Sequence, residues 1–213
     1  METDRRKNVD KIIALLKEAH PDAKLALEFS NPLELLVALI LAAQAPDERV
    51  NTVTASLFKK YKTPADWAAA EPETLQKELS SIPFYRNKSR SIQNACRELL
   101  EKFAGKVPGN LDDLLTLPGV GRKTANIVLG NAFGKPAIGV DRHVARVAGR
   151  LGLSNNTDPD KIEADLVPII PPEEQVHFCH LLQYHGRRIC ASKTPKCPQC
   201  TISPFCAFQN KSK

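Results

Sequence analysis

The chain has 213 residues, of which 42% are hydrophobic and 25% are charged, and its formal net charge is +6. These values are typical of a soluble globular protein with one large or two small domains. The longest apolar run, residues 35–43, is too short to span a membrane, and the first ten residues carry charge where a signal peptide needs an apolar core. We therefore expect a cytoplasmic protein with no membrane segment, whose basic charge suits a polyanionic partner.

Apolar residues recur at helical spacing along the chain, and sustained period-2 alternation is absent, so we predict an all-α fold. Asn31 caps a helix that begins at Pro32, runs to about residue 43 and is apolar nearly all round, which is typical of a core helix. We expect Asp47 to cap the next helix. Further helices are expected to begin near residues 9, 64, 72, 88, 111, 122, 142, 159 and 173.

The chain is organised around residues 115–141. A short apolar face of Leu111, Leu114 and Leu115 is followed by a break at residues 118–121, and helical periodicity resumes over 122–133. The sequence of the break is Pro-Gly-Val-Gly, and glycine permits unusual backbone angles and the close approach of a partner. The turn is therefore either an ordinary joint between helices or a site whose N–H groups bind a phosphate.

The side chains that follow this turn favour a functional role. Gly119 and Gly121 are followed by Arg122 and Lys123 at the helix start, where the helix dipole disfavours cations. The helix carries the chain roughly 15 Å away from Lys123 at about 1.5 Å per residue. The next seven residues, if extended, reach back roughly 23 Å at about 3.3 Å per residue. Asp141 can therefore lie near Lys123 and act as its catalytic partner. The alternative is that Asp141 is a plain helix cap.

Four of the six cysteines lie close together near the C-terminus, at the spacing C-x6-C-x2-C-x5-C. They are Cys190, Cys197, Cys200 and Cys206. Such a set predicts a metal centre, because four thiolates can hold zinc or a [4Fe–4S] cluster. Zinc ribbons usually contain two C-x2-C pairs, and this stretch contains one. The other two, Cys96 and Cys179, are expected to be small core residues.

Three motifs together resemble the endonuclease III family of DNA repair glycosylases. Leu117-Pro-Gly-Val-Gly-Arg-Lys-Thr-Ala125 resembles the family's helix-hairpin-helix signature, and Val140-Asp-Arg-His143 resembles its downstream aspartate segment. The four-cysteine stretch is similar to its iron–sulfur loop, so we favour a [4Fe–4S] cluster of structural role. The resemblance covers nearly the whole chain and implies two helical domains with a DNA cleft between them. Residues 23–135 would form a six-helix barrel, and residues 1–22 with 136–213 the iron–sulfur domain.

The resemblance also implies a reaction. The family's lysine, here Lys123, attacks C1′ of the deoxyribose of an extruded nucleotide, displaces the base and forms an imine. Loss of a C2′ proton then leads to β-elimination, which cuts the strand on the 3′ side. Asp141 would assist deprotonation and stabilise the cationic transition state. The implied partner is double-stranded DNA with an oxidised pyrimidine or an abasic site, bound by a monomeric enzyme.

Several other residues are candidates for contact with DNA. Gln44 matches the family's hole-filling glutamine, although a plain helix end is the alternative, and Phe84 is either a wedge beside the unpaired base or a buried residue. Pro83 stands where the family commonly has glycine. Arg146 and Arg150 are expected to face solvent. The remaining candidates, for phosphate contact, are Gly119, Gly121, Arg122, Arg142, His143, Lys193 and Lys196.

Three other functions stay open from the residues alone. The related adenine-specific mismatch glycosylases lack a lysine at the position of Lys123 and usually carry an extra C-terminal domain. A helical DNA-binding module without catalysis would keep the hairpin but show no lyase activity. A zinc-stabilised scaffold would be separated by metal analysis. The hairpin carbonyls are also a candidate site for a monovalent cation.

Overall fold

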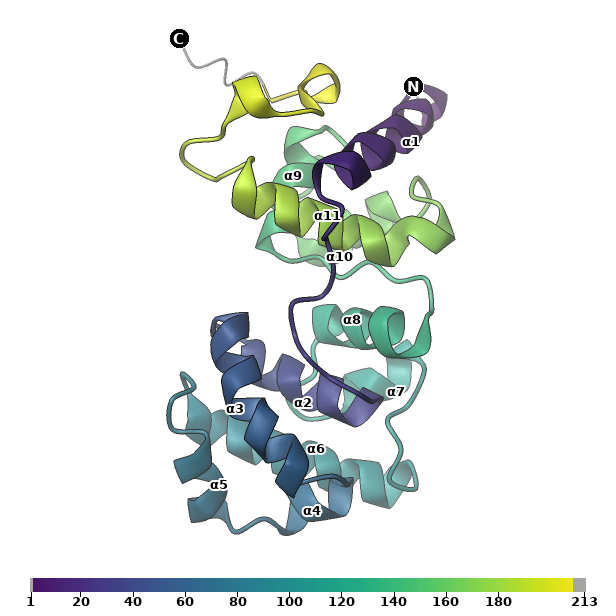
Figure 1. Cartoon of the computed structure of the whole chain (residues 1–213). Helices are drawn as coiled ribbons and strands as arrows, with labels where there is room; N and C mark the ends of the chain where they lie inside the picture. The colour runs from purple at the N-terminus through teal and green to yellow at the C-terminus, as the bar shows by residue number, and fades with distance from the viewer. Residues whose placement is uncertain (1, 209–213) are drawn as a thin grey trace. The chain divides into compact units, whose positions relative to one another are not determined.

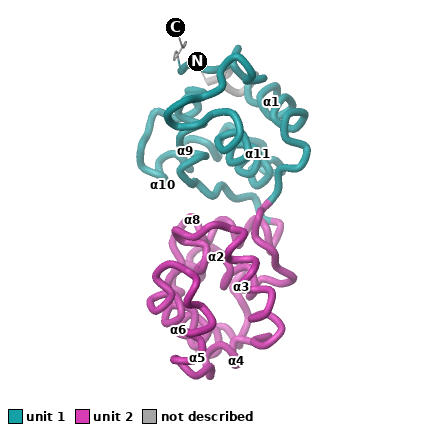
Figure 2. Tube along the Cα trace, turned by 60° about the vertical axis from the view of Figure 1, so that its left-hand side comes forward, with its two compact units in different colours: residues 1–24, 135–213 teal, residues 25–134 magenta. Residues whose placement is uncertain are grey.

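The computed structural model describes residues 2–208, which form helices and connecting segments without a strand. The predicted all-α fold is therefore confirmed. The chain divides into two compact units, one of residues 25–134 and one that joins residues 1–24 to residues 135–213 (Figure 2). The second unit is thus discontinuous in sequence. Within the described residues, no helix has both the length and the apolar character needed to cross a lipid bilayer.

The unit of residues 25–134 is built around one apolar helix. Its helices are α2 (Pro32–Ala42), α3 (Asp47–Lys60), α4 (Pro64–Ala69), α5 (Pro72–Glu78), α6 (Tyr85–Lys102), α7 (Leu111–Thr116) and α8 (Arg122–Phe133). Helix α2 packs against α3, α6 and α8 (Figure 1). Leu35, Leu36 and Leu41 on α2 are fully buried, so this helix forms the core that the sequence predicts. Around it, α6 also packs on α4 and α5, and α7 on α8.

The starts of these helices follow from local chemistry, with two corrections. The side chain of Asn31 accepts the N–H of Glu34 at 3.0 Å, which confirms the predicted cap of α2. The prediction for α3 was wrong, because Pro46 occupies the cap position and Asp47 is the first helical residue. Helix α6 begins at Tyr85, three residues before the predicted start, after a left-handed residue at its cap position.

The other unit packs its helices around a second core. It contains α1 (Glu2–Ala19), α9 (Arg142–Arg150), α10 (Pro159–Leu166), α11 (Gln175–Arg188) and the 3-10 turns η1 (Pro172–Glu174), η2 (Cys197–Gln199) and η3 (Ser203–Phe205). Helix α11 contacts both α1 and α9. Leu16, Val144 and Phe178 from these three helices are fully buried in this core. The core therefore fixes α9, which begins one residue after Asp141.

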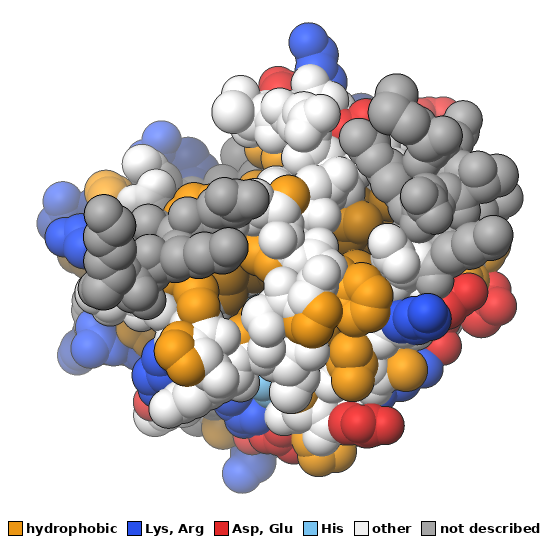
Figure 3. Space-filling view, turned by 90° about the horizontal axis from the view of Figure 1, so that it is seen from above, with side chains coloured by type: hydrophobic (Ala, Val, Ile, Leu, Met, Phe, Trp, Pro, Cys, Tyr) orange, Lys and Arg blue, Asp and Glu red, His pale blue; other side chains and the backbone are white. Residues whose placement is uncertain are grey.

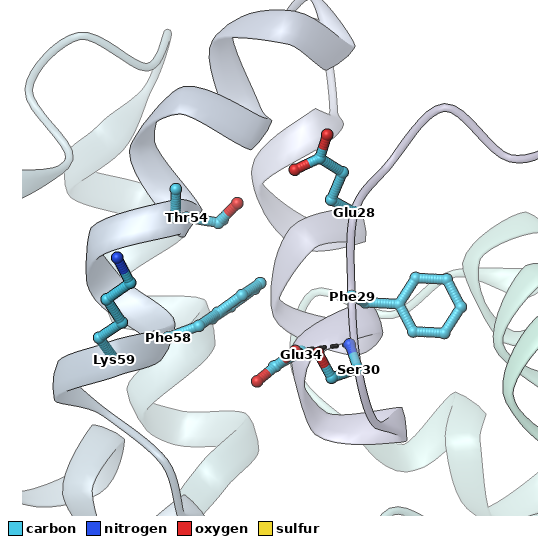
Figure 4. A pocket seen from close by; sticks show the side chains of 8 residues that line it. Glu28, Phe29, Ser30, Glu34, Thr54, Phe58 and Lys59 are labelled. Atoms are coloured by element: carbon cyan, nitrogen blue, oxygen red, sulfur yellow. Dashed lines mark hydrogen bonds between the residues drawn. The ribbon is translucent and has the colours of Figure 1, made fainter.

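One face of the molecule and one pocket narrow the search for a site. Figure 3 shows one face on which lysine and arginine side chains stand at the margins while hydrophobic side chains lie between them. Where the described residues are visible on that face, the positive charge is not gathered into a single patch. An open pocket of about 350 Å³ lies between α3 and the segment before α2 (Figure 4), lined by Glu28, Phe29, Ser30, Glu34, Thr54, Ala55, Phe58 and Lys59. Its carboxylates do not suit a polyanionic ligand.

Candidate active site and cysteine centre

The glycine turn between α7 and α8 is held against the core of its unit. Gly119 has a left-handed φ of +82°, and a Cβ added there would lie 2.9 Å from Cβ of Ser91 on α6. The backbone therefore passes too close to α6 for a side chain. One expectation fails here, because Leu114 is buried but Leu115 is 39% exposed, so the apolar face of α7 is narrower than predicted.

The second glycine of the turn, unlike the first, is not crowded by neighbouring atoms. Gly121 is the cap residue of α8, and a Cβ added to it would meet no atom within 4 Å. No side chain caps this helix start, and its first turn holds no acidic residue. The start of α8 is therefore open beside Gly121 and carries the positive end of the helix dipole without a side-chain cap, which is an arrangement that binds an anionic group.

Lys123 is the second residue of α8 and is exposed beside this turn. Its neighbours further along the helix, Ala125 and Val128, are fully buried. The helix is therefore fixed by its inner face while the lysine amine is free to reach a ligand. Arg122 is half-buried at the first helical position. Both cations belong to the unit of residues 25–134.

Asp141 lies in the other unit and caps α9. Its Oδ1 accepts the backbone N–H groups of His143 at 2.8 Å and Val144 at 2.7 Å. Asp141 is therefore a helix cap, which was one of the two interpretations of this residue. It does not exclude a chemical role, because both bonds use one carboxylate oxygen and Asp141 is half-buried rather than enclosed. The cap fixes the position of the carboxylate while Oδ2 remains able to act on a ligand.

The surroundings of His143 lower the pKa of its ring. Burial lowers its pKa, and the charges of Arg146, Arg142 and Arg187 lower it further, whereas Asp141 opposes them. Both ring nitrogens face arginine side chains: Nη2 of Arg146 lies 3.0 Å from Nδ1, and Nε of Arg142 lies 3.3 Å from Nε2. The histidine is thus fixed in place beside the Asp141 cap.

An open pocket of about 600 Å³ adjoins this histidine within the same unit. Arg142, Arg146 and Arg187 line it together with Ser192. Gly186 forms part of its wall, and a Cβ there would lie only 3.0 Å from His143. Three guanidinium groups around one depression suit an anionic ligand such as a phosphate.

The expectation that Arg146 and Arg150 face solvent was wrong. Nε and Nη2 of Arg146 donate to the carbonyls of Cys190 at 3.0 Å and Gly186 at 2.9 Å. Arg150 donates to Sγ of Cys190 at 3.1 Å and to the carbonyl of Ala191 at 2.8 Å. Arg146 and Arg150 of α9 therefore anchor the segment that carries the first cysteine of the predicted metal centre.

The four clustered cysteines all lie beyond α11, in the stretch with the turns η2 and η3, and all are free thiols. Cys190, Cys200 and Cys206 pack against the core of their unit. Burial raises the pKa of Cys200, and charge on each of the other three cysteines would raise it further. The thiols are thus close enough to interact, although no three metal-binding side chains in the described part of the chain form a ligand set.

Two more contacts tie this stretch to its unit. Nε2 of His185 lies 3.4 Å from Sγ of Cys200, and Sγ of Cys206 donates to the carbonyl of Arg150 at 3.2 Å. Ile202, between these cysteines, is 1% exposed and anchors the loop in the core. The sequence pattern did not indicate His185, because a lone histidine on a helix carries no motif.

The two other cysteines are packing residues, as predicted. Cys96 and Cys179 are 1% and 5% exposed. Burial raises the pKa of each thiol to about 12. Both are therefore protonated and unreactive at neutral pH.

The remaining DNA-contact candidates all lie on the surface. Lys193 and Lys196 are exposed in the cysteine stretch. Gln44 is exposed just after α2, and Phe84, at the cap of α6, is 63% exposed. The alternative that Phe84 is buried is thereby excluded. Both have a left-handed φ of 58°, which is rare for residues with a side chain.

Comparison with known proteins defines the class to which this fold and these motifs belong. Residues 37–172 match the model of the HhH-GPD superfamily of base excision DNA repair proteins. The endonuclease III of Synechocystis sp. is 43% identical over 203 residues, which cover 95% of this chain and 93% of that protein. The chain therefore belongs to the HhH-GPD superfamily and, within it, to the endonuclease III family.

Solved structures of the family have the same fold. A non-covalent endonuclease III–DNA complex and a trapped endonuclease III–DNA covalent intermediate, an estranged-adenine complex, each match with a TM-score of 0.89. Each protein is 43% identical to this one, and the match covers 95% of both chains. The all-helical arrangement with two units is therefore that of the family.

Proposed function

We propose that this protein is a bifunctional DNA glycosylase and abasic-site lyase of base excision repair that removes oxidised pyrimidines. One observation carries the proposal: an exposed lysine stands at the open start of the hairpin helix α8, in a chain 43% identical to an endonuclease III that was trapped covalently on DNA. An amine placed beside a phosphate-binding turn is suited to attack the sugar of an extruded nucleotide.

Lys123 is the proposed nucleophile. Its neutral amine forms a bond to C1′ as the bond between C1′ and the base breaks, and the base leaves with a proton. Ring opening gives an imine between Nζ and C1′. Loss of a proton from C2′ then expels the 3′ phosphate, which cuts the strand, and water hydrolyses the imine. Each step uses only the lysine amine, a proton acceptor and water.

Asp141 is proposed to act on the same nucleotide. Its capping bonds fix the carboxylate, and its charge stabilises the cationic sugar as the base departs. The same carboxylate accepts the proton of the attacking amine. Because both groups come from one chain, the proposal needs only a monomer, and a DNA substrate agrees with the predicted intracellular location.

The cysteine stretch is proposed to hold a [4Fe–4S] cluster through Cys190, Cys197, Cys200 and Cys206. The chemistry of the loop supports the proposal: it carries four free thiols, three of them, Cys190, Cys200 and Cys206, pack against the same core, and a guanidinium donates to Sγ of Cys190. When bound, the cluster orders a loop that has little apolar content of its own. Iron and sulfide analysis of the purified protein tests this assignment, and a stoichiometric zinc content instead would contradict it.

The DNA backbone is proposed to meet both units. In the unit of residues 25–134 the start of α8, with Gly119, Gly121 and Arg122, offers N–H groups and charge to a phosphate. In the other unit the pocket with Arg142 and His143 offers a second anion site. Lys193 and Lys196 are proposed to add phosphate contacts from the cysteine stretch.

An extruded nucleotide leaves a gap in the base stack, which side chains fill in many base-flipping proteins. Gln44 and Phe84 are the proposed filling and wedging residues. Both are exposed, and both have left-handed backbones. Such strained positions are concentrated at functional sites.

The boundaries of the two domains are also proposed. We assign residues 23–135 to the barrel that carries the hairpin, and residues 1–22 with 136–213 to the iron–sulfur domain. Both catalytic candidates then lie close to the same domain boundary in sequence, with Lys123 before it and Asp141 after it.

The experiment is a borohydride trapping assay on duplexes with one oxidised pyrimidine, one abasic site or no lesion. We expect a covalent protein–DNA adduct and a 3′-side strand cut on the first two duplexes only. Lys123→Ala removes both, whereas Lys62→Ala, at an exposed lysine outside the hairpin, keeps both. Base release without any adduct or strand cut by the wild-type protein would contradict the lyase assignment.

A further inference from the structure

A buried cation lies outside the hairpin and the cysteine stretch. Lys88 on α6 is 7% exposed, and its Nζ donates to the carbonyl oxygens of Leu41 at 2.8 Å and Ala43 at 2.6 Å. Burial lowers the pKa of this ammonium group. In the described residues no acidic side chain pairs with it, so its charge is compensated by backbone carbonyls alone. Burying an ammonium group without a charged partner lowers the folding stability, so a role for Lys88 at this position is expected.

The carbonyls that Lys88 binds belong to the end of α2. The last carbonyls of a helix lack intrahelical partners and carry the negative end of the helix dipole, so they favour a cation. Helix α2 has no basic residue in its own last turn. Lys88 supplies that cation from α6, across 45 residues of sequence in the case of Ala43.

The residue that follows these carbonyls is Gln44. The Ala43 carbonyl bound by Lys88 is part of the peptide group that leads directly into Gln44, whose φ of 58° is left-handed. The N–H of Ala45 closes the turn on the carbonyl of Ala42 at 3.1 Å. By fixing the plane of that peptide group, Lys88 fixes the direction in which the chain enters Gln44.

Lys88 is also bonded to the second left-handed residue. Its backbone N–H donates to the carbonyl of Phe84 at 3.1 Å, in the first turn of α6. Phe84 has the same φ of 58°. One residue thus bonds through its side chain to the peptide group before Gln44 and through its backbone to the carbonyl of Phe84.

We propose that Lys88 is a positioning residue that holds the Gln44 turn in register with Phe84, so that both side chains enter the duplex together when a nucleotide is extruded. This inference rests on the proposed glycosylase function. Lys88 touches neither the DNA nor the reacting atoms in this account. It acts through Gln44, and loss of the lysine should therefore matter only while Gln44 is present.

A double-mutant cycle tests this dependence. The variants are Lys88→Met, Gln44→Ala and the pair, with Lys102→Met as the control, because Lys102 is an exposed lysine at the end of the same helix. One readout is the fluorescence of 2-aminopurine opposite a tetrahydrofuran abasic analogue, and the other is single-turnover base excision. We expect Lys88→Met to lower both by about tenfold, Lys102→Met to leave both unchanged, and the pair to match Gln44→Ala within twofold. The inference is overturned if the effects of the two single substitutions multiply in the pair. It is also overturned if Lys88→Met has the same fluorescence and excision rate as the wild type.

A measurement without DNA separates this inference from the proposed function. The amide hydrogen exchange of Ala45, which reports the closed turn, should be about tenfold faster in Lys88→Met than in Lys102→Met. Unchanged exchange contradicts the holding role even if the wild type is an active glycosylase. If the wild type does not form an adduct with DNA, the proposed glycosylase function is contradicted. The exchange rate of Ala45 still decides whether Lys88 holds the Gln44 turn. Where Lys88→Met does not fold, Lys88→Gln, which keeps one donor group, should give smaller effects of the same kind.

Discussion

Oδ1 of Asp141 lies 2.7 Å from the backbone N of Val144, so the proposed catalytic carboxylate is also the cap of α9. The two roles can be separated by substitution, because asparagine caps a helix as well as aspartate but carries no charge.

Asp141→Asn should keep the stability of the protein within about 0.5 kcal/mol and lower base excision by about 10²–10³-fold. Asp158→Asn is the matched control, since Asp158 caps α10 through the same kind of bonds. Thermal melting and single-turnover excision measure the two effects. Equal activity of the two variants would remove Asp141 from the chemistry.

The two glycines of the hairpin should respond oppositely to serine. Gly119→Ser places its Cβ 2.9 Å from Ser91 in a left-handed backbone and should cost about 1–3 kcal/mol of folding stability. Gly121→Ser enters open space and adds a good helix cap, so stability should be kept or rise. The new hydroxyl then competes with phosphate for the N–H groups, and affinity for abasic duplex should fall by about tenfold. Tight binding by a stable Gly121→Ser protein would show that this turn does not meet a phosphate.

Arg150→Gln should loosen the cysteine stretch. Its guanidinium makes charge-assisted bonds to Sγ of Cys190 and to two carbonyls of residues 191–192. We expect iron retention during chelator challenge to be about tenfold weaker, as for other residues that support metal ligands. Arg188→Gln is the control, because Arg188 forms an exposed ion pair with Asp22. Iron analysis and visible absorbance report the result, and equal retention in both variants would argue against an anchoring role.

His180 should make stability depend on pH. Burial lowers its pKa to about 4, with His177 adding to the effect, while an unfolded histidine titrates near 6.5. The folded state therefore binds the proton less well, so the full contribution is present above pH 6.5 and is lost as the pH falls towards 4. The expected size is about 3 kcal/mol. Unfolding of the wild type and of His180→Gln at several pH values checks this, and the variant should show the shallower dependence; parallel curves would exclude His180 as the source.

Local chemistry explains why much of this fold was predictable from sequence. Asn31 caps α2 as predicted, and α10 begins at Pro159 as predicted, because the cap bonds of Asn31 and Asp158 span only two or three residues. The same holds for the start of α8 after the glycine turn. The cysteine spacing likewise identified four thiols that share one loop.

Long-range bonds explain what the sequence did not show. Arg146 and Arg150 sit at positions that a helical pattern assigns to solvent, yet their partners lie 44 and 41 residues away. Lys88 reaches a carbonyl 47 residues back along the chain. No periodicity or motif encodes such partners, because they depend on which elements pack together.

The central claim is that the amine of Lys123 bonds to the sugar of a damaged nucleotide. The most direct measurement is mass spectrometry of the proteolysed, borohydride-reduced adduct formed on abasic duplex. We predict that the sugar remnant is attached to Nζ of Lys123. A remnant on any other lysine or on the terminal amine, or an adduct that persists in Lys123→Ala, would contradict the account.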